Sequence, residues 1–146
     1  MKIASTRFGA LQVEDRDILT FPHGLIGLAD YTEWLLLADG KNAQVAWLQA
    51  MDSPEIAVPV VNPKHYAPSY QVRLAADELR AVGLEDTSDL TVLGVVSKDG
   101  PSLTLNLKAP IILNLDRQVG RQIITLDEQP IQMELVAAPV TFRRSA

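Results

Sequence analysis

Apolar residues recur along this chain in short runs that proline and glycine interrupt, and the period within several runs is two. Three segments alternate in this way: residues 11–13, 103–107 and 131–135. The apolar residues that share a face are Leu103, Leu105 and Leu107 in the second segment, and Ile131, Met133 and Leu135 in the third. The alternation predicts half-buried antiparallel strands.

Other runs are apolar on both faces, and they comprise residues 34–38, 45–50, 57–61, 90–96 and 111–115. Strands of this kind lie inside a closed or double-layered sheet, because each face meets other parts of the protein. The pattern predicts about ten short strands in all, too many for one flat sheet with a bare face. A barrel or split barrel removes the unpaired edges.

Residues 75–84 break the period of two. Leu79 and Val82 are three apart, and Gly83 is suited to a left-handed stop at a helix end. Ala75 is a poor N-cap because its side chain offers no acceptor. Taken together, the patterns predict an all-β fold, a small antiparallel barrel-like (split-barrel) domain with one short helix near residues 75–83.

The length of 146 residues, with 47% apolar and 21% charged residues, is typical of one globular domain spanning residues 1–146. No early stretch has the pattern of a signal peptide, and no run of about 18 apolar residues is present to cross a membrane. We therefore expect a soluble, cytoplasmic protein without a membrane partner. The absence of cysteine excludes disulfides, thiol nucleophiles and thiolate metal sites.

The net charge of -5 disfavours direct binding of nucleic acid, which requires clustered Lys and Arg. The charge is uneven, because residues 77–99 carry six acidic and two basic side chains. Glu85, Asp86 and Asp89 lie near the centre of this segment. A solvated acidic face is the simpler interpretation, and a face that docks a basic protein partner is the alternative.

The residue types offer little for catalysis or metal binding. The two histidines, His23 and His65, have no metal ligand at helical spacing, and no serine lies in a nucleophile-elbow sequence. We therefore predict no catalytic residue, no metal site and no cofactor. Trp34 and Trp47 occur in apolar strands, where an aromatic ring fills a core and its indole N–H needs a partner. A stacking platform for bases or sugars is the alternative.

Residues 21–24, Phe-Pro-His-Gly, are typical of a bend at the end of a strand. Pro22 favours an extended Phe21, and a type I turn accepts proline at its second position and glycine at its fourth. His23 is then expected to face solvent as an ordinary turn residue.

Five short stretches are informative through their order and separation: TRFG at 6–9, ILTFPHGLIGL at 18–28, WLQAMD at 47–52, NLKAPIILN at 106–114 and GRQIITL at 120–126. Together they resemble the flagellar assembly factor FliW family, over a span from Met1 to about Leu126. The chain departs from the family's common GLPGF at Ile26 and Leu28. The segment after Leu126, which contains Phe142, Arg143 and Arg144, has no clear match, and no function is assigned to it.

The resemblance implies a small all-β, barrel-like protein without catalytic activity. Members of the family bind cytosolic flagellin and also bind the translational regulator CsrA, which they prevent from repressing translation of flagellin mRNA. Flagellin and CsrA compete, so secretion of flagellin frees the factor to capture CsrA. An acidic protein suits a regulator that grips RNA with basic residues, either by mimicking RNA or by docking elsewhere and acting allosterically. The resemblance favours the allosteric form.

Three surfaces are candidates for partner contact: the apolar turn with Phe21, Pro22, Leu25 and Ile26, the region with Asn106, Pro110 and Asn114, and the acidic stretch with Glu85, Asp86 and Asp89. Each also has a purely structural interpretation. Phe21 suits the core, the asparagines suit turn backbone, and Pro110 suits a strand edge or bulge. The alternative function is a small split-barrel cofactor-binding protein or enzyme, with the tryptophans lining a pocket.

Overall fold

The structure is a computed structural model that describes residues 1–135. Residues 136–146, among them Phe142, Arg143 and Arg144, lie outside the described part, so the extent of the domain to residue 146 stays a prediction.

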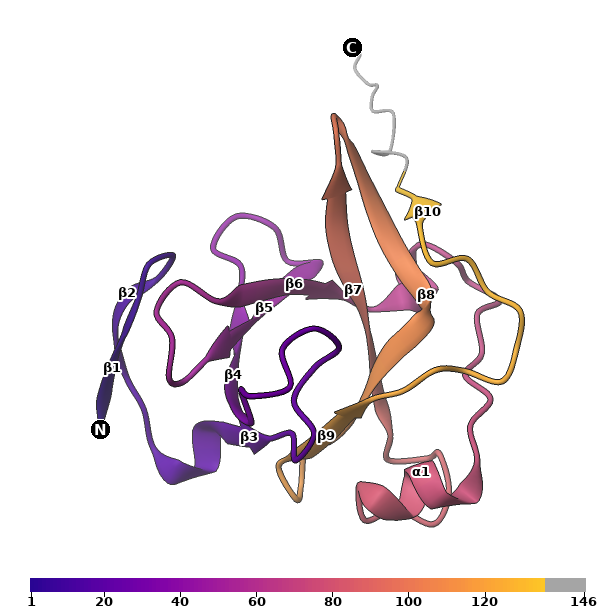
Figure 1. The fold of residues 1–146 in the computed structure, drawn as a ribbon, viewed down its shortest axis with the longest axis horizontal. Coiled ribbons are helices and arrows are strands. Elements are labelled where there is room, and N and C mark those ends of the chain that lie inside the picture. The colour runs from indigo at the N-terminus through magenta and orange to yellow at the C-terminus, as the bar shows by residue number, and fades with distance from the viewer. Residues whose placement is uncertain (136–146) are drawn as a thin grey trace.

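The described residues form ten strands, one α-helix and two 3₁₀ helices, as Figure 1 shows. In chain order they are β1 (Lys2–Ser5), β2 (Gly9–Gln12), η1 (Asp15–Asp17), β3 (Ile18–Thr20), β4 (Glu33–Ala38), β5 (Val45–Ala50), β6 (Ala57–Val61), η2 (Pro63–His65), α1 (Ala76–Ala81), β7 (Thr91–Asp99), β8 (Ser102–Asn114), β9 (Val119–Gln122) and β10 (Met133–Glu134).

Eight of the strands form one sheet that closes on itself. Their order is β10-β8-β7-β6-β5-β4-β3-β9, and β9 also pairs with β8, so that seven strands complete a barrel. Neighbouring strands are antiparallel except β3 and β9, which meet in parallel at Thr20 and Val119. β1 and β2 form a separate hairpin. The prediction of an all-β, barrel-like domain is confirmed.

β8 is the longest strand, and an irregularity divides it. Leu93 of β7 pairs with Ile111, but two residues later Val95 pairs with Asn106, so residues 107–110 have no partner on β7. The Asn106 Oδ1 atom accepts the N–H groups of residues 108 and 109 at 3.0 and 2.9 Å. Pro110 has no N–H to satisfy, which suits it to this place. Residues 106–110 are called the β8 bulge below.

The barrel interior is filled by large side chains from most of its strands. Phe21, Trp34, Leu48 and Ile111 are completely buried. The Trp34 indole N–H donates to the carbonyl of Tyr31 at 2.7 Å, so this tryptophan is a satisfied core residue, as the first of the two interpretations expects.

The predicted helix is confirmed and is slightly shorter than its pattern, since α1 covers Ala76–Ala81. Ala75 makes no side-chain cap, and Gly83 follows the helix with a φ of 78°. Val82 is completely buried in a small cluster with Ile112 and Ile123, which seats the end of the helix on the barrel.

Two of the predicted strand faces are wrong at one position each, although Leu105 and Leu107 are buried and Met133 and Leu135 pack against them as predicted. Leu103 is 49% exposed while its neighbour Thr104 is buried, and Ile131 is 64% exposed outside β10. The reason is that the β7–β8 hairpin extends beyond the barrel in Figure 1, so alternation at its tip no longer faces a core. β10 pairs with β8 only through Met133 and Glu134, which leaves Ile131 without a strand partner.

Candidate partner-binding surfaces

The loop at residues 21–28 begins with the predicted bend. The Gly24 N–H donates to the Phe21 carbonyl at 2.8 Å, and Gly24 has a φ of 64°. Pro22 and His23 are exposed, as expected for turn residues. Phe21 is completely buried, so it belongs to the core and offers no surface for a partner.

The tip of this loop presents one apolar side chain to solvent. Leu25 is only 4% exposed, whereas Ile26 is 61% exposed. Four residues were predicted for this surface. Pro22 and Ile26 are accessible to a partner, whereas Phe21 and Leu25 are buried in the core.

Gln122 joins the loop to the β8 bulge. Its Oε1 atom accepts the Ile26 N–H at 2.8 Å, and its Nε2 atom donates to the Ala109 carbonyl at 2.9 Å. Three stretches that carry the family resemblance thus meet at a single side chain, although Ile26 and Gln122 are 96 residues apart. We call this arrangement of the loop, the bulge and β9 the barrel junction.

Gly120 makes the close packing of the barrel junction possible. A Cβ atom built at this position would lie 2.5 Å from the Phe21 ring and 2.5 Å from the Leu113 side chain. Real Cβ atoms do not approach other atoms so closely, so only glycine lets Phe21 fill the barrel here.

An apolar strip continues from the barrel junction along the outside of the chain. Ile124 is 57% exposed and Leu126 is 64% exposed, while Ile123 and Thr125, which alternate with them, are buried. Sequence reasoning missed this strip because residues 123 and 124 are both isoleucine, which hides the period of two. The alternation from Gln122 to Leu126 is the signal that reveals it.

Asn106, Pro110 and Asn114 shape the backbone and present little surface. Pro110 and Asn114 are buried. The Asn114 side chain donates to the Val82 carbonyl at 2.9 Å and accepts the Arg117 N–H at 3.3 Å. The structural interpretation of these three residues, as turn and bulge residues, is confirmed.

The acidic stretch lies just after α1 and is exposed, including Glu85, Asp86 and Asp89. The Ser88 hydroxyl and the Ser88 N–H both donate to the Asp86 carboxylate and lower the pKa of Asp86. This turn, residues 85–89, is called the acidic turn below. It is not part of the barrel junction.

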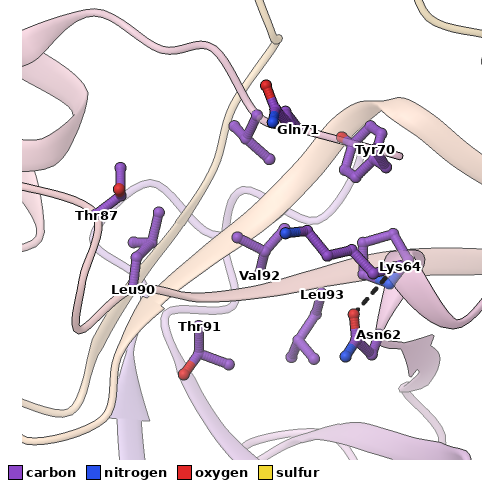
Figure 2. A pocket seen from close by; sticks show the side chains of 11 residues that line it. Asn62, Lys64, Tyr70, Gln71, Thr87, Leu90, Thr91, Val92 and Leu93 are labelled. Atoms are coloured by element: carbon purple, nitrogen blue, oxygen red, sulfur yellow. Dashed lines mark hydrogen bonds between the residues drawn. The ribbon is translucent and has the colours of Figure 1, made fainter. Parts of the chain in front are cut away.

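The acidic turn borders an open groove of about 440 Å³. Figure 2 shows Thr87 and Leu90 at one side of this groove and Asn62 at the other, with the Lys64 side chain extended towards Val92. Eleven residues line the groove: Asn62, Pro63, Lys64, Tyr70, Gln71, Val72, Thr87, Leu90, Thr91, Val92 and Leu93. Lys64 is the one charged side chain among them.

Tyr70 lines the groove, and a hydrogen bond to the β8 bulge holds its side chain in place. Its hydroxyl donates to the Leu107 carbonyl, in the β8 bulge, at 2.7 Å. Burial, aided by the negative charge of Asp127, raises the pKa of Tyr70 to about 12. The groove and the bulge are therefore connected through this one side chain.

Residues 2–135 match the FliW protein family. The chain belongs to the FliW family. The flagellar assembly factor FliW of Bdellovibrio bacteriovorus is 36% identical over 129 residues, which cover 87% of this chain and 74% of that protein. The flagellar assembly factor FliW of Geotalea uraniireducens is 36% identical over 131 residues, which cover 88% of this chain and 80% of that protein.

A crystal structure of the flagellar assembly factor FliW has the same fold as this FliW-family chain. The TM-score is 0.85, and the superposition covers 96% of this chain and 100% of that one. The sequence identity is 23%, so this likeness concerns the fold alone. It agrees with the closed barrel and the single short α-helix described above.

Two further stretches of the FliW resemblance meet where the β1–β2 hairpin docks on the barrel. The Ser5 hydroxyl, at the end of β1, donates to the completely buried Gln49 at 2.7 Å. The Arg7 guanidinium lies 3.8 Å from the Trp47 ring centre, and the Trp47 indole donates to Asp39 at 2.9 Å. This hydrogen bond is the main reason that the pKa of Asp39 is lowered.

The alternative function, a cofactor-binding protein or enzyme, expects the tryptophans to line a pocket, but they do not line the groove. Neither Trp34 nor Trp47 is among the residues that line the groove. Trp34 is buried in the core, and Arg7 covers one face of Trp47. Among residues 1–135, no group of three or more His, Asp or Glu side chains is arranged to hold a metal ion. The helices within these residues are all too short to span a bilayer.

Proposed function

We propose that this FliW-family protein is a non-enzymatic, cytoplasmic flagellar assembly factor that binds flagellin. When free of flagellin, it binds the translational regulator CsrA and relieves repression of flagellin mRNA translation. The observation that carries the proposal is family membership over residues 2–135, with relatives named as flagellar assembly factors. The protein acts through protein contacts and needs no cofactor, membrane or nucleic acid.

The exposed apolar strip at the barrel junction is the proposed contact for flagellin. Ile26, Ile124 and Leu126 are each more than half exposed, and the exposed Pro22 lies in the same loop as Ile26. Removing such apolar side chains from water at an interface is favourable and stabilises the complex. The hydrogen bonds of Gln122 hold the loop in place before binding, which lowers the entropy cost of association.

The acidic turn is the proposed contact for CsrA, which grips RNA with basic residues. Glu85, Asp86 and Asp89 are exposed and lie together in a chain whose net charge is -5. Opposite charge speeds the encounter of two proteins and fixes their relative orientation. The charge alone suits both a contact that covers the RNA-binding residues of CsrA and a contact elsewhere on it, and the FliW resemblance favours the second, allosteric form.

The direct test is titration of the purified protein with flagellin and with CsrA from the same organism, by isothermal calorimetry. We expect micromolar or tighter binding to each, and we expect flagellin to displace CsrA. Failure to bind either partner at micromolar concentrations would falsify the proposed function. A thermal-shift screen with flavins and nucleotides tests the alternative of a cofactor-binding protein, and a large shift would favour that alternative.

A further inference from the structure

The barrel is closed, but its pairing between β6 and β7 is short. These two strands pair only through Val60 with Val95 and Val61 with Gly94. β6 then ends at Val61, and the chain turns away into η2. β7 continues to Thr91, with β8 along one side. The residues from Thr91 to Leu93 therefore have a strand partner on one side and none on the other.

Pro63 explains why β6 stops pairing at this point. If the register of Val61 with Gly94 continued for two residues, Pro63 would lie opposite Val92. Proline has no N–H to donate, so it cannot extend the ladder. Among residues 1–135, none of the backbone hydrogen bonds made outside the strand ladders involves Thr91, Val92 or Leu93.

An open strand edge is a template for another extended chain. The edge at residues 91–93 belongs to the groove, and Val72, Leu90 and Val92 supply apolar surface there. Three residues of strand span roughly 10 Å, which gives room for a ladder of three or four residues. The combination of unpaired backbone and apolar surface fits an extended peptide better than it fits a helix or a small molecule.

The charges around the groove indicate which peptide fits. Lys64 is the single charged side chain in the lining, and it makes no ion pair within residues 1–135. Its side chain extends towards Val92, as Figure 2 shows. At the other side, Thr87 belongs to the acidic turn, beside Asp86. The groove thus has a positive side chain over the strand edge, and at Thr87 it adjoins the acidic turn, whose carboxylates lie outside the lining.

We propose that this groove binds an extended segment of a protein partner, which adds as a strand to the free edge of β7. The segment carries an acidic side chain that pairs with Lys64, and a basic side chain a few residues away that faces the acidic turn. Main-chain hydrogen bonds provide affinity, and the two charges fix the direction of the bound segment. The inference does not depend on which partner supplies the segment, and it holds whether or not flagellin or CsrA binds.

The test uses a random octapeptide library displayed on phage as the probe. The wild-type protein is compared with Lys64→Glu, which reverses the charge, and with Thr87→Trp, which fills the rim. Lys64 and Thr87 are exposed, so both variants should fold. Lys98→Glu and Ser97→Trp are matched controls, because these exposed residues lie on β7 but outside the groove.

We expect the wild type to select peptides in which Asp or Glu and Lys or Arg flank alternating apolar residues. Synthetic copies should slow amide exchange at residues 91–93, and Lys64→Glu and Thr87→Trp should each weaken their binding at least tenfold. The two controls should leave binding unchanged. The inference is overturned if no peptide is enriched, if bound peptides leave exchange at residues 91–93 unchanged, or if the controls weaken binding as much as the groove variants.

Discussion

The barrel junction and the groove at the β6–β7 seam are built in opposite ways. At the junction, Gln122 and Gly120 lock together segments that are distant in sequence, and the backbone groups of the β8 bulge find partners. At the groove, one strand edge has no partner and Lys64 has no counter-ion within the described residues. The junction therefore keeps the fold closed, whereas the groove retains unused binding capacity.

Sequence motifs of the chain lie at the junction and not at the groove. The stretches that carry the FliW resemblance, among them residues 18–28, 106–114 and 120–126, converge on the junction and mainly serve the architecture. The groove is made mostly by residues between these stretches. A motif that identifies a family is therefore a guide to its fold first, and binding surfaces have to be located from exposure, charge and open edges.

Phe21→Ala should have the largest effect on stability. Phe21 is completely buried in the barrel, and its truncation should lower the free energy of unfolding by about 3–5 kcal/mol. Ile26→Ala, five residues later and 61% exposed, should change it by about 0.5 kcal/mol at most. Urea denaturation of both variants measures the difference. Similar losses in the two variants would contradict the assignment of Phe21 to the core and Ile26 to the surface.

Gly120→Ala should come next. The added methyl group would overlap the Phe21 ring and the Leu113 side chain, and overpacking of this kind costs about 1–3 kcal/mol. Gly40→Ala is the matched control, because a Cβ atom there has no neighbour within 4 Å. Thermal denaturation should show a lower melting temperature for the first variant and an unchanged one for the second. A stable Gly120→Ala protein would show that the junction has room to relax.

Tyr70→Phe tests the link between the two regions. Removal of the hydroxyl leaves the Leu107 carbonyl without its buried donor, at a cost of about 1–2 kcal/mol near neutral pH. The folded pKa of about 12 lies above the ordinary value of 10.0, so the stability that it contributes is complete below pH 10. This contribution is lost as the pH rises from 10 through 12.

Urea midpoints measured across this pH range check the prediction. The wild type should lose stability between pH 10 and 12 more steeply than Tyr70→Phe does. Tyr66→Phe, in a partly buried residue next to η2, is the control and should keep the wild-type slope. Parallel curves for the wild type and Tyr70→Phe would refute the role assigned to burial of this phenol.

Gln122→Ala should loosen the junction locally. Two hydrogen bonds are lost, and because Gln122 is only partly buried, water replaces much of them, so the global loss should be about 1 kcal/mol. Faster amide exchange in residues 24–28 is the specific signature. Gln12→Ala, at an exposed position of β2, is the control. Unchanged exchange in the loop would mean that other contacts hold it.

Glu85→Lys combined with Asp86→Lys should leave folding almost unaffected, because both residues are exposed. If the acidic turn guides CsrA, the association rate should fall by about tenfold, and its dependence on salt should weaken. The matched control is Asp30→Lys with Glu55→Lys, which makes the same change in net charge at other exposed positions. Stopped-flow kinetics measure the rates. Equal effects of the two double variants would remove the acidic turn from the proposed interface.

The barrel was largely predictable from the sequence where strands are apolar on both faces. The runs at residues 45–50 and 57–61 coincide with β5 and β6, because β-branched and aromatic residues there are bounded by turn residues. Alternation was less reliable at the hairpin tip, where Leu103 faces solvent. A period of two indicates two faces, but which face is buried depends on what packs against the strand.

The candidate surfaces were only partly predictable. The bend after Phe21 and the exposure of Glu85, Asp86 and Asp89 follow from local residue preferences. The contact between Ile26 and Gln122 does not, because no local pattern encodes a pairing across 96 residues. The groove was also not foreseen, since it depends on how far β7 runs past the end of β6 at Pro63.

The late position of β9 has a consequence for synthesis on the ribosome. β3 meets β9 at Thr20 and Val119, and Gln118 also reaches back to the carbonyls of Asp15 and Ile18. The nascent chain emerges from its N-terminus. β3 is therefore made long before β9, and the barrel cannot close until β9 has been synthesised. During that interval the edge of β3 is bare and Phe21 lacks its packing against Gly120. A ribosome that stalls shortly before residue 118 therefore holds an incomplete barrel, whose unpaired β3 edge and exposed apolar surface favour aggregation.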